Sequence, residues 1–221
     1  MASLLLPIIY LAFISLGLPD ALLGAAWPTM YPQLGAQVSW AGGVSMIISA
    51  CTILSALASD RLNERLGTGR VTAISVATTA AALLGFSFCH AFWQLCLWAI
   101  PYGLGAGSVD AALNNYVALH YKSRHMSWLH CMWSVGASLG PVIMGQALAG
   151  SGWQGGYRII GILQVVLTVV LLFSLPLWKL PQDAMGGEPF TPQHRSFPEL
   201  LKITGVPEVL VCFLCYCALE S

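Results

Sequence analysis

Two carboxylic acids stand inside stretches of sequence that are otherwise apolar. Asp20 lies in GLPDALL and Asp110 lies in GSVDAALNNY, each about 16 to 18 residues into its apolar run and therefore deep in any membrane that the run crosses. A carboxylate at that depth costs several kcal/mol unless it faces a polar cavity or binds a proton. A carboxyl group whose surroundings alternate between wet and dry can take up and release a proton. The structural alternative is a hydrogen bond between helices, at a backbone gap near Pro19 or with an amide.

Small and amide side chains surround Asp110 on its predicted helix. A narrow stripe at helical spacing is formed by Gly103, Gly107, Asp110 and Asn114. The glycines let a second helix approach closely, and the acid and the amide then point into the same space. We expect Asp110, Asn114 and Asn115 to bind solute hydroxyls or a proton.

A second polar stripe lies in the segment WLHCMWSVGASLGP. His130, Ser134 and Ser138 recur every four residues, and Trp128 and Trp133 flank them. Histidine titrates near neutrality, and indole rings stack on sugar faces or donate one hydrogen bond, so His130 and Trp133 are candidates for a carbohydrate site. Alternatively, the tryptophans anchor the helix at the membrane interface and His130 is a packing residue.

Two further candidates are weaker, and one acidic residue stays undecided. Trp27 follows Asp20 and Gly24 on one helical face, and Gln164 is an amide inside an apolar run. We include Trp27 and Gln164 among the residues that could line a solute site. Glu220 lies at membrane depth in the last apolar run, and its role is left open.

The chain shows no pattern of an intramembrane enzyme or of a metal centre. It has no H-E-x-x-H motif and no nucleophile with a base at a recognisable spacing. The C-x-x-C within CFLCYC has no second pair and no histidine cluster to complete a tetrahedral metal site. We interpret the seven cysteines as reduced packing residues, and we expect no enzyme activity, no metal and no cofactor.

The composition is that of a membrane protein. Of 221 residues, 57% are hydrophobic and only 8% are charged, whereas soluble domains carry roughly 25% charged residues. The net charge is zero and no basic block occurs, so nucleic acid is not expected as a partner. The first residues lack a basic n-region and contain Asp20, so we interpret them as a retained spanning helix and not as a signal peptide.

Apolar runs of about 20 residues predict transmembrane helices. Six complete runs are present, at roughly 4–31, 39–59, 71–90, 92–118, 126–150 and 156–178. A polar segment rich in Pro and Gly, 179–205, follows as a cytoplasmic linker between halves, and a seventh helix begins at 206 and is cut short at 221. We therefore predict a six-helix bundle over residues 1–178, with loops such as DRLNERLGTGR forming tight turns.

The basic residues fix the predicted orientation, because cytoplasmic loops are enriched in Lys and Arg. With the N-terminus in the cytoplasm, only Arg158 lies outside. The other eight basic residues all lie inside: Arg61, Arg65, Arg70, Lys122, Arg124, Lys179, Arg195 and Lys202.

An internal repeat links the first and fourth runs. GLPDALL at 17–23 and GSVDAAL at 107–113 share Gly-x-x-Asp-Ala-x-Leu, and Ser-Trp opens both the second and the fifth run. Since three helices separate the copies, the second copy enters the membrane from the opposite side. This 3+3 inverted repeat is the construction of secondary transporters, whose sites form near the midplane.

These features together resemble the N-terminal half of a major facilitator superfamily transporter. The loop after the second run is similar to the superfamily motif Gly-x-x-x-Asp-Arg-x-Gly-Arg-Arg/Lys, with Asp60, Arg61, Gly67 and Arg70 as a gating loop. Ala56 replaces the leading glycine of the motif, and about three extra residues intervene. A second resemblance is the GxxxGPxxxG pattern at 136–145. An ordinary solvated loop is the alternative for the first motif.

Within the superfamily, LPDALLGAAWP, GLGAGSVDAALNNYVALHY and WLHCMWSVGASLGP resemble the fucose-permease-like proton-coupled sugar transporters. That resemblance implies acidic residues in the first and fourth helices that handle substrate and proton, at the positions of Asp20 and Asp110. The fourth helix here carries Asp where the longer Glu is usual. It also lacks the Arg that drug exporters often carry there, which argues against a proton/drug antiporter.

The predicted protein is thus an all-α integral membrane protein with a six-helix half-bundle and the start of a seventh helix. We expect uptake of a sugar or similar polar solute, coupled to protons, by alternating access. The expected partners are the lipid bilayer and a missing C-terminal six-helix half or a second copy, and the expected location is the plasma or inner membrane. The alternatives are an efflux carrier for drugs or metabolites and a truncated membrane protein that transports nothing.

Overall fold

The computed structural model describes residues 2–179, 199 and 202–220. It divides into two compact units, residues 1–180 and residues 181–221, which are described separately. The first unit contains α1 (Ala2–Gly17), α2 (Leu22–Gln33), α3 (Trp40–Leu66), α4 (Thr68–Ser87), α5 (Phe92–His120), α6 (Ser123–Leu148), α7 (Gly152–Ser174) and the short 3-10 helix η1 (Leu175–Lys179). The second unit contains α9 (Val206–Glu220), which begins where the sequence predicts a seventh helix. The described residues contain helices and no strand, which confirms the all-α prediction.

Five helical segments of the described chain are long and apolar enough to cross a membrane. They are Leu4–Gln33, Trp40–Leu66, Thr68–Ser87, Ser123–Leu148 and Gly152–Trp178. The remaining long helix, α5, has 29 residues and is long enough to span, although it is not one of these five segments. With α5 counted, and α1 and α2 taken together, the first unit has the six long helical segments of the predicted half-bundle.

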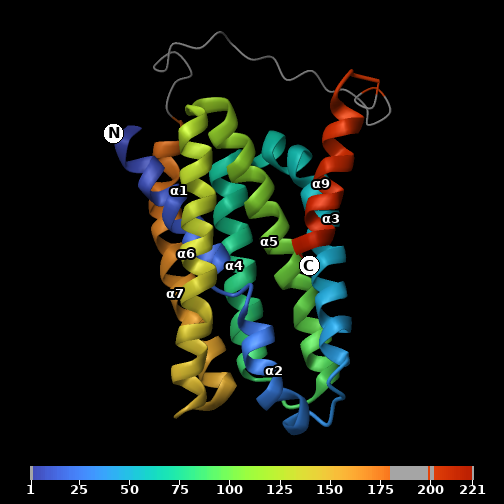
Figure 1. Cartoon of the computed structure of the whole chain (residues 1–221). Coiled ribbons are helices and arrows are strands. Elements are labelled where there is room, and N and C mark those ends of the chain that lie inside the picture. Colours follow the sequence, from blue (N-terminus) through green and yellow to red (C-terminus); the bar gives the residue numbers. More distant parts are fainter. Residues whose placement is uncertain (1, 180–198, 200–201, 221) are drawn as a thin grey trace. The chain divides into compact units, whose positions relative to one another are not determined.

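Three of the main contacts between the six spans are related as an inverted repeat would relate them (Figure 1). The first three spans are α1/α2, α3 and α4, and the last three are α5, α6 and α7. Three of the extensive contacts between these two groups join α1 to α6, α3 to α5 and α4 to α7, and a fourth joins α4 to α5. The repeat relates the first span to α5, α3 to α6, and α4 to α7. It therefore converts the α1–α6 contact into the α3–α5 contact and leaves the α4–α7 contact unchanged. These three pairings agree with the predicted 3+3 inverted repeat, whereas the α4–α5 contact has only a weak counterpart between α7 and the first span.

Two equivalent glycines show the repeat at the level of single contacts. A Cβ atom on Gly17 of α1 would collide with the main-chain oxygen of Trp133 on α6. A Cβ atom on Gly107 of α5 would collide with the main-chain oxygen of Thr52 on α3. Gly17 and Gly107 are the shared first residues of the repeated motif. In both copies the glycine lets two helices meet backbone to backbone.

Two apolar clusters form the core of the bundle, one towards each end. The first surrounds Met30, Leu95, Met144 and Trp153, and the second surrounds Phe13 with other buried aliphatic residues of α1, α4, α5, α6 and α7. Along the first span the division falls between Leu16 and Leu18, and along α5 it falls between Tyr102 and Val109. The two aspartates follow these divisions closely, so both lie near mid-depth.

The first apolar run is not one helix, contrary to the prediction for 4–31. The helix ends at Gly17, residues 18–21 form a turn, and α2 begins at Leu22. Pro19 has no N–H to donate, and the N–H groups of Asp20 and Leu22 bond three residues back, to Gly17 and Pro19. The α-helical ladder is therefore interrupted at the predicted acidic residue.

The loop DRLNERLGTGR is also not a loop, so the predicted turn was wrong. The second helix continues through Asp60 and Arg61 to Leu66, and α4 begins at Thr68. Only Gly67 separates them, with φ 81° and ψ 147°, a conformation that is essentially confined to glycine. The charged residues end the apolar run, but Arg61, Glu64 and Arg65 are good helix formers, so the helix extends beyond its apolar part.

Smaller differences affect the other helix ends, which lie two to four residues from the predicted limits in most cases. The predicted sixth run, to 178, ends as an α-helix at Ser174 and continues as η1. Most of the predicted linker 179–205 lies outside the described residues, as does the side chain of Glu220.

Candidate functional site

Asp20 lies in the α1–α2 break and joins two other helices through its carboxylate. The hydroxyl of Tyr102 on α5 donates a hydrogen bond to Asp20 Oδ1 at 3.4 Å. The indole Nε1 of Trp133 on α6 donates to Asp20 Oδ2 at 2.9 Å. Each carboxylate oxygen thus has its own donor from a different helix. Asp20 nevertheless keeps an exposed surface in the described chain.

The break at Pro19 explains why Asp20 can reach both donors. In a continuous helix its side chain would be fixed to one face of the first span, whereas the turn at 18–21 gives it a separate orientation. The close approach at Gly17 brings the main chain of Trp133 against α1. The glycine and the proline therefore position the carboxylate against α5 and α6.

Asp110 lies on α5 and has a partner on its own helix. The Asn114 amide donates hydrogen bonds to Asp110 Oδ1 and to the main-chain oxygen of Asp110, both at 3.0 Å. Gly103 and Gly107 are buried against the main chain of α3, as the predicted glycine stripe requires, whereas Asp110 is exposed. The stripe is therefore divided, with the glycines in the helix contact and the acid on the uncovered side. Asn115 is exposed as well.

The polar residues of α6 lie on the same bundle but are engaged locally. His130 is exposed, packs edge-on against Phe13 with ring centroids 6.1 Å apart, and lies within electrostatic range of Asp110. The hydroxyls of Ser134 and Ser138 donate to main-chain oxygens one turn back, at 3.1 and 2.8 Å. Trp133 is half-buried and is the α6 residue that contacts an acid directly.

Trp27 and Gln164 are placed in buried contacts between elements and not beside the two acids. The Trp27 indole donates to the main-chain oxygen of Val38 at 2.8 Å, and only 5% of the residue is exposed. The Gln164 amide nitrogen donates to the main-chain oxygen of Ser15 at 2.6 Å, and its oxygen has no partner among the described residues. Each of these two hydrogen bonds joins one segment of the chain to another.

A cavity of about 230 Å³ adjoins Asp20 and contains residues that the sequence did not single out. Besides Asp20 and Gly24 it is lined by Ser45 and Ser49 of α3, Phe86 of α4, Tyr102 of α5 and Tyr157 of α7, with aliphatic side chains between them. The two serines lie four residues apart, so they share a helix face. That spacing inside an apolar run is the signal that could have found them.

The family comparison decides what kind of protein carries this arrangement. The model of the Major Facilitator Superfamily matches residues 9–220. The chain belongs to the major facilitator superfamily. No match was found among the curated proteins.

Membership makes this chain a multi-pass membrane protein of a transporter family. Superfamily carriers are built from six-helix halves, each with a 3+3 inverted repeat, and their solute sites lie near the bilayer midplane. The two acids lie near mid-depth of this bundle, close to the boundary between its two apolar clusters. Among the described residues no group of three or more His, Cys, Asp or Glu is placed to bind a metal ion.

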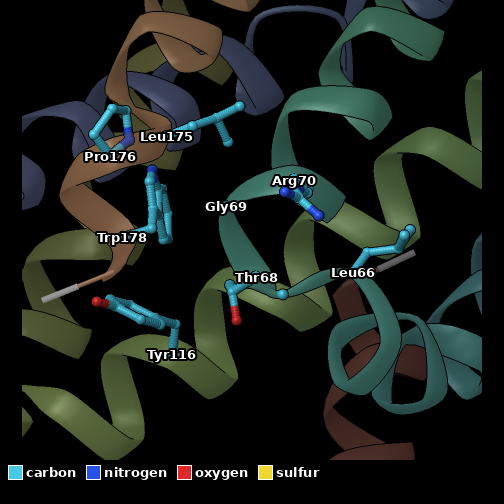
Figure 2. Close-up of a pocket in the computed structure, with 9 residues that line it drawn as sticks. Leu66, Thr68, Gly69, Arg70, Tyr116, Leu175, Pro176 and Trp178 are labelled. Atoms are coloured by element: carbon cyan, nitrogen blue, oxygen red, sulfur yellow. The ribbon is translucent and has the colours of Figure 1, made fainter. Parts of the chain in front are cut away.

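Two of the four predicted gating-loop residues, Gly67 and Arg70, line a second cavity, of about 450 Å³, at the α3–α4 connection (Figure 2). Figure 2 shows Arg70 of α4 on one side of it, with Trp178 of η1 and Tyr116 of α5 on the other. Gly67 lines the cavity, and the Trp178 ring packs against Gly69 so closely that a Cβ there would collide with it. Asp60 and Arg61 are exposed on the last turns of α3, and a charge-based lock at this turn stays a prediction.

Proposed function

We propose that this superfamily chain takes part in proton-coupled uptake of a sugar or a similar small polar solute by alternating access. The observation that carries the proposal is the pair of exposed mid-depth acids, Asp20 and Asp110, on one bundle. Exposed acids at this depth need a polar cavity, and carriers of this type place such a cavity between two six-helix bundles. The second bundle would come from the rest of the carrier or from a second copy of the chain.

The two acids offer different chemistry to a solute and a proton. Asp110 and Asn114 form an acceptor beside an amide donor, and Asn115 adds a second amide nearby. A sugar hydroxyl both donates and accepts, so it suits such a pair. Asp20 already receives a hydrogen bond on each oxygen, and we assign it to the proton. The motifs around these residues support the fucose-permease-like branch.

Uptake into proteoliposomes tests this function. With an inward proton gradient, the reconstituted protein is expected to accumulate a labelled hexose or deoxyhexose, and a protonophore is expected to abolish the accumulation. Asp110→Asn is expected to abolish uptake because it removes the acceptor charge beside Asn114. Gradient-driven export of an aromatic dye without any sugar uptake would favour the efflux alternative. Neither uptake nor export would favour a chain that transports nothing.

We further propose a plasma-membrane or inner-membrane location with the N-terminus in the cytoplasm. The ends of α3 and α5 and the starts of α4 and α6 carry the basic residues Arg61, Arg65, Arg70, Lys122 and Arg124, and Arg158 lies near the start of α7. The positive-inside rule places the first group in the cytoplasm. A membrane-impermeant amine reagent is expected to label exposed Lys122 in inside-out vesicles and not in right-side-out vesicles. The reverse labelling would contradict this orientation.

A further inference from the structure

The cavity beside Asp20 has an open mouth and a closed floor. Asp20, Gly24, Ser45 and Ser49 line it and are exposed, so they form the mouth between the α1–α2 break and α3. The floor is formed by buried side chains from other helices, including Phe86, Tyr102 and Tyr157. The polar groups thus gather at the mouth, and aromatic rings close the inner end.

Tyr157 is the feature of the floor that points to a ligand. Only 3% of this residue is exposed, and its ring packs against Phe86 with centroids 5.3 Å apart. Within the described chain no side-chain hydrogen bond to the Tyr157 hydroxyl is found, although this residue lines the cavity. The Tyr157 oxygen is not among the fully buried polar atoms of the described residues that lack a partner, so it is open to the space of the cavity. A phenol hydroxyl can donate and accept, so a hydroxylated molecule inside the cavity can bond to it.

The hydroxyls at the mouth are unengaged too. Ser45 and Ser49 form no side-chain hydrogen bond with another described residue, in contrast to Ser134 and Ser138, which bond to their own helix. Each serine can donate and accept. Together with the Asp20 carboxylate they form a polar rim above an apolar, aromatic floor, as is typical of small-molecule sites.

We propose that this cavity is a binding subsite for a single sugar ring, with Tyr157 as a specificity-determining residue. The proposal rests on the proposed transport of a hydroxylated solute, and it adds to the Asp110–Asn114 pair a second, separate place at which one ring of that solute binds. A ring with hydroxyls at its edge and C–H groups on its faces meets both the serine rim and the Phe86–Tyr157 wall. The volume of about 230 Å³ equals that of roughly eight water molecules, which holds most of one ring and not two.

Filling the cavity is the most direct test. A Cβ on Gly24 would meet nothing within 4 Å, so Gly24→Leu is expected to fold and to occupy the mouth. Binding of tritiated D-glucose, D-galactose and L-fucose to the purified protein is measured by scintillation proximity. Gly24→Leu is expected to weaken the best of these at least tenfold. Gly42→Leu is the matched control, because its Cβ also meets nothing and it lies outside the cavity, so its affinity is expected to equal the wild-type value.

Removing one hydroxyl tests Tyr157 without changing the shape of the floor. Tyr157→Phe is expected to weaken binding of the same sugar about five- to tenfold, the usual effect of one lost hydrogen bond. Tyr31→Phe is the control, since Tyr31 also forms no side-chain hydrogen bond in the described chain and lies outside the cavity. Excess maltose or lactose is expected not to compete with the labelled monosaccharide.

The outcomes separate this subsite from the proposed function. Wild-type affinity in both Gly24→Leu and Tyr157→Phe, with uptake intact, would overturn the subsite and leave transport standing. Competition by disaccharides as strong as that by monosaccharides would overturn the single-ring limit. If the wild-type protein neither binds nor transports any of the three sugars, the proposed function fails first and the subsite fails with it. Thermal melting of each variant shows whether it is folded.

Discussion

Replacing Asp20 with asparagine is expected to abolish the accumulation of solute under a proton gradient while solute exchange persists. Asparagine cannot carry a proton, so the internal solute concentration is expected to rise only to the external one. The fold is expected to survive, because the amide can be arranged like the acid. Its oxygen accepts from the Trp133 indole, and its nitrogen donates to the Tyr102 hydroxyl, which can also accept.

The measurement compares accumulation under an inward proton gradient with exchange of labelled for unlabelled solute at equal pH. Trp133→Phe and Tyr102→Phe serve as graded variants, since each removes one hydrogen bond to Asp20 and leaves the acid in place. Each is expected to slow accumulation by about three- to tenfold, which corresponds to one hydrogen bond. Accumulation by Asp20→Asn at the wild-type level would show that Asp20 does not carry the proton, and the role would then be assigned to Asp110.

Gly107→Ala is expected to lower the stability of the bundle by about 1–3 kcal/mol, the usual cost of an overpacked contact. The added Cβ would collide with the main-chain oxygen of Thr52, and a main chain cannot rotate away as a side chain can. An exposed helical glycine gives the opposite result. The Cβ of Gly43→Ala on α3 meets nothing within 4 Å, so the gain in helix propensity, up to about 1 kcal/mol, is expected to raise stability.

Melting of the two variants in detergent, followed by loss of the monodisperse peak, provides the comparison. The opposite signs of the two shifts are the informative result, because both substitutions add the same methyl group to a helix. Gly17→Ala, which collides with Trp133 in the equivalent contact, is expected to behave like Gly107→Ala. Equal melting temperatures for Gly107→Ala and Gly43→Ala would show that the α3–α5 contact relaxes at no cost.

The number of spans could be predicted from sequence because apolar length is encoded locally. A run of about 20 apolar residues is long enough to span a bilayer, and neighbouring segments have little influence on whether it does. Helix ends are less well encoded. Asp60 and Arg61 end the apolar run where the membrane ends, but the helix continues to Leu66 since the backbone ladder does not depend on the bilayer.

The break in the first span illustrates what local sequence does not settle. Pro7, Pro28, Pro32, Pro101 and Pro141 all lie inside helices, and only at Pro19 does the described chain interrupt a span. A proline alone therefore does not determine where a span is interrupted. At this position the close backbone contact at Gly17 and the bonds from Asp20 to two other helices add tertiary interactions that favour a turn.

The two acids, with Trp133 and Asn114 beside them, could be named from the sequence, whereas the other residues of the cavity beside Asp20 could not. A carboxylate in an apolar run is conspicuous, so Asp20 and Asp110 stand out from composition alone. Tyr102 and Tyr157 are ordinary residues of apolar helices, and they matter only because five different helical segments converge on one cavity. Which helices meet, and at what height, depends on packing between residues far apart in the chain. For the same reason Trp27 and Gln164 could not be separated in advance from the residues near the acids.

The single residue that joins α3 to α4 has a mechanical consequence. With no slack beyond Gly67, these two helices form a corner and are expected to tilt as one lever. α3 has 27 residues, so the lever arm is about 40 Å long, and Ser45 and Ser49 lie near its far end. A small rotation at the corner is therefore expected to displace the mouth of the Asp20 cavity by several ångströms. In this way a change at the charged turn on one membrane surface is transmitted towards the opposite surface.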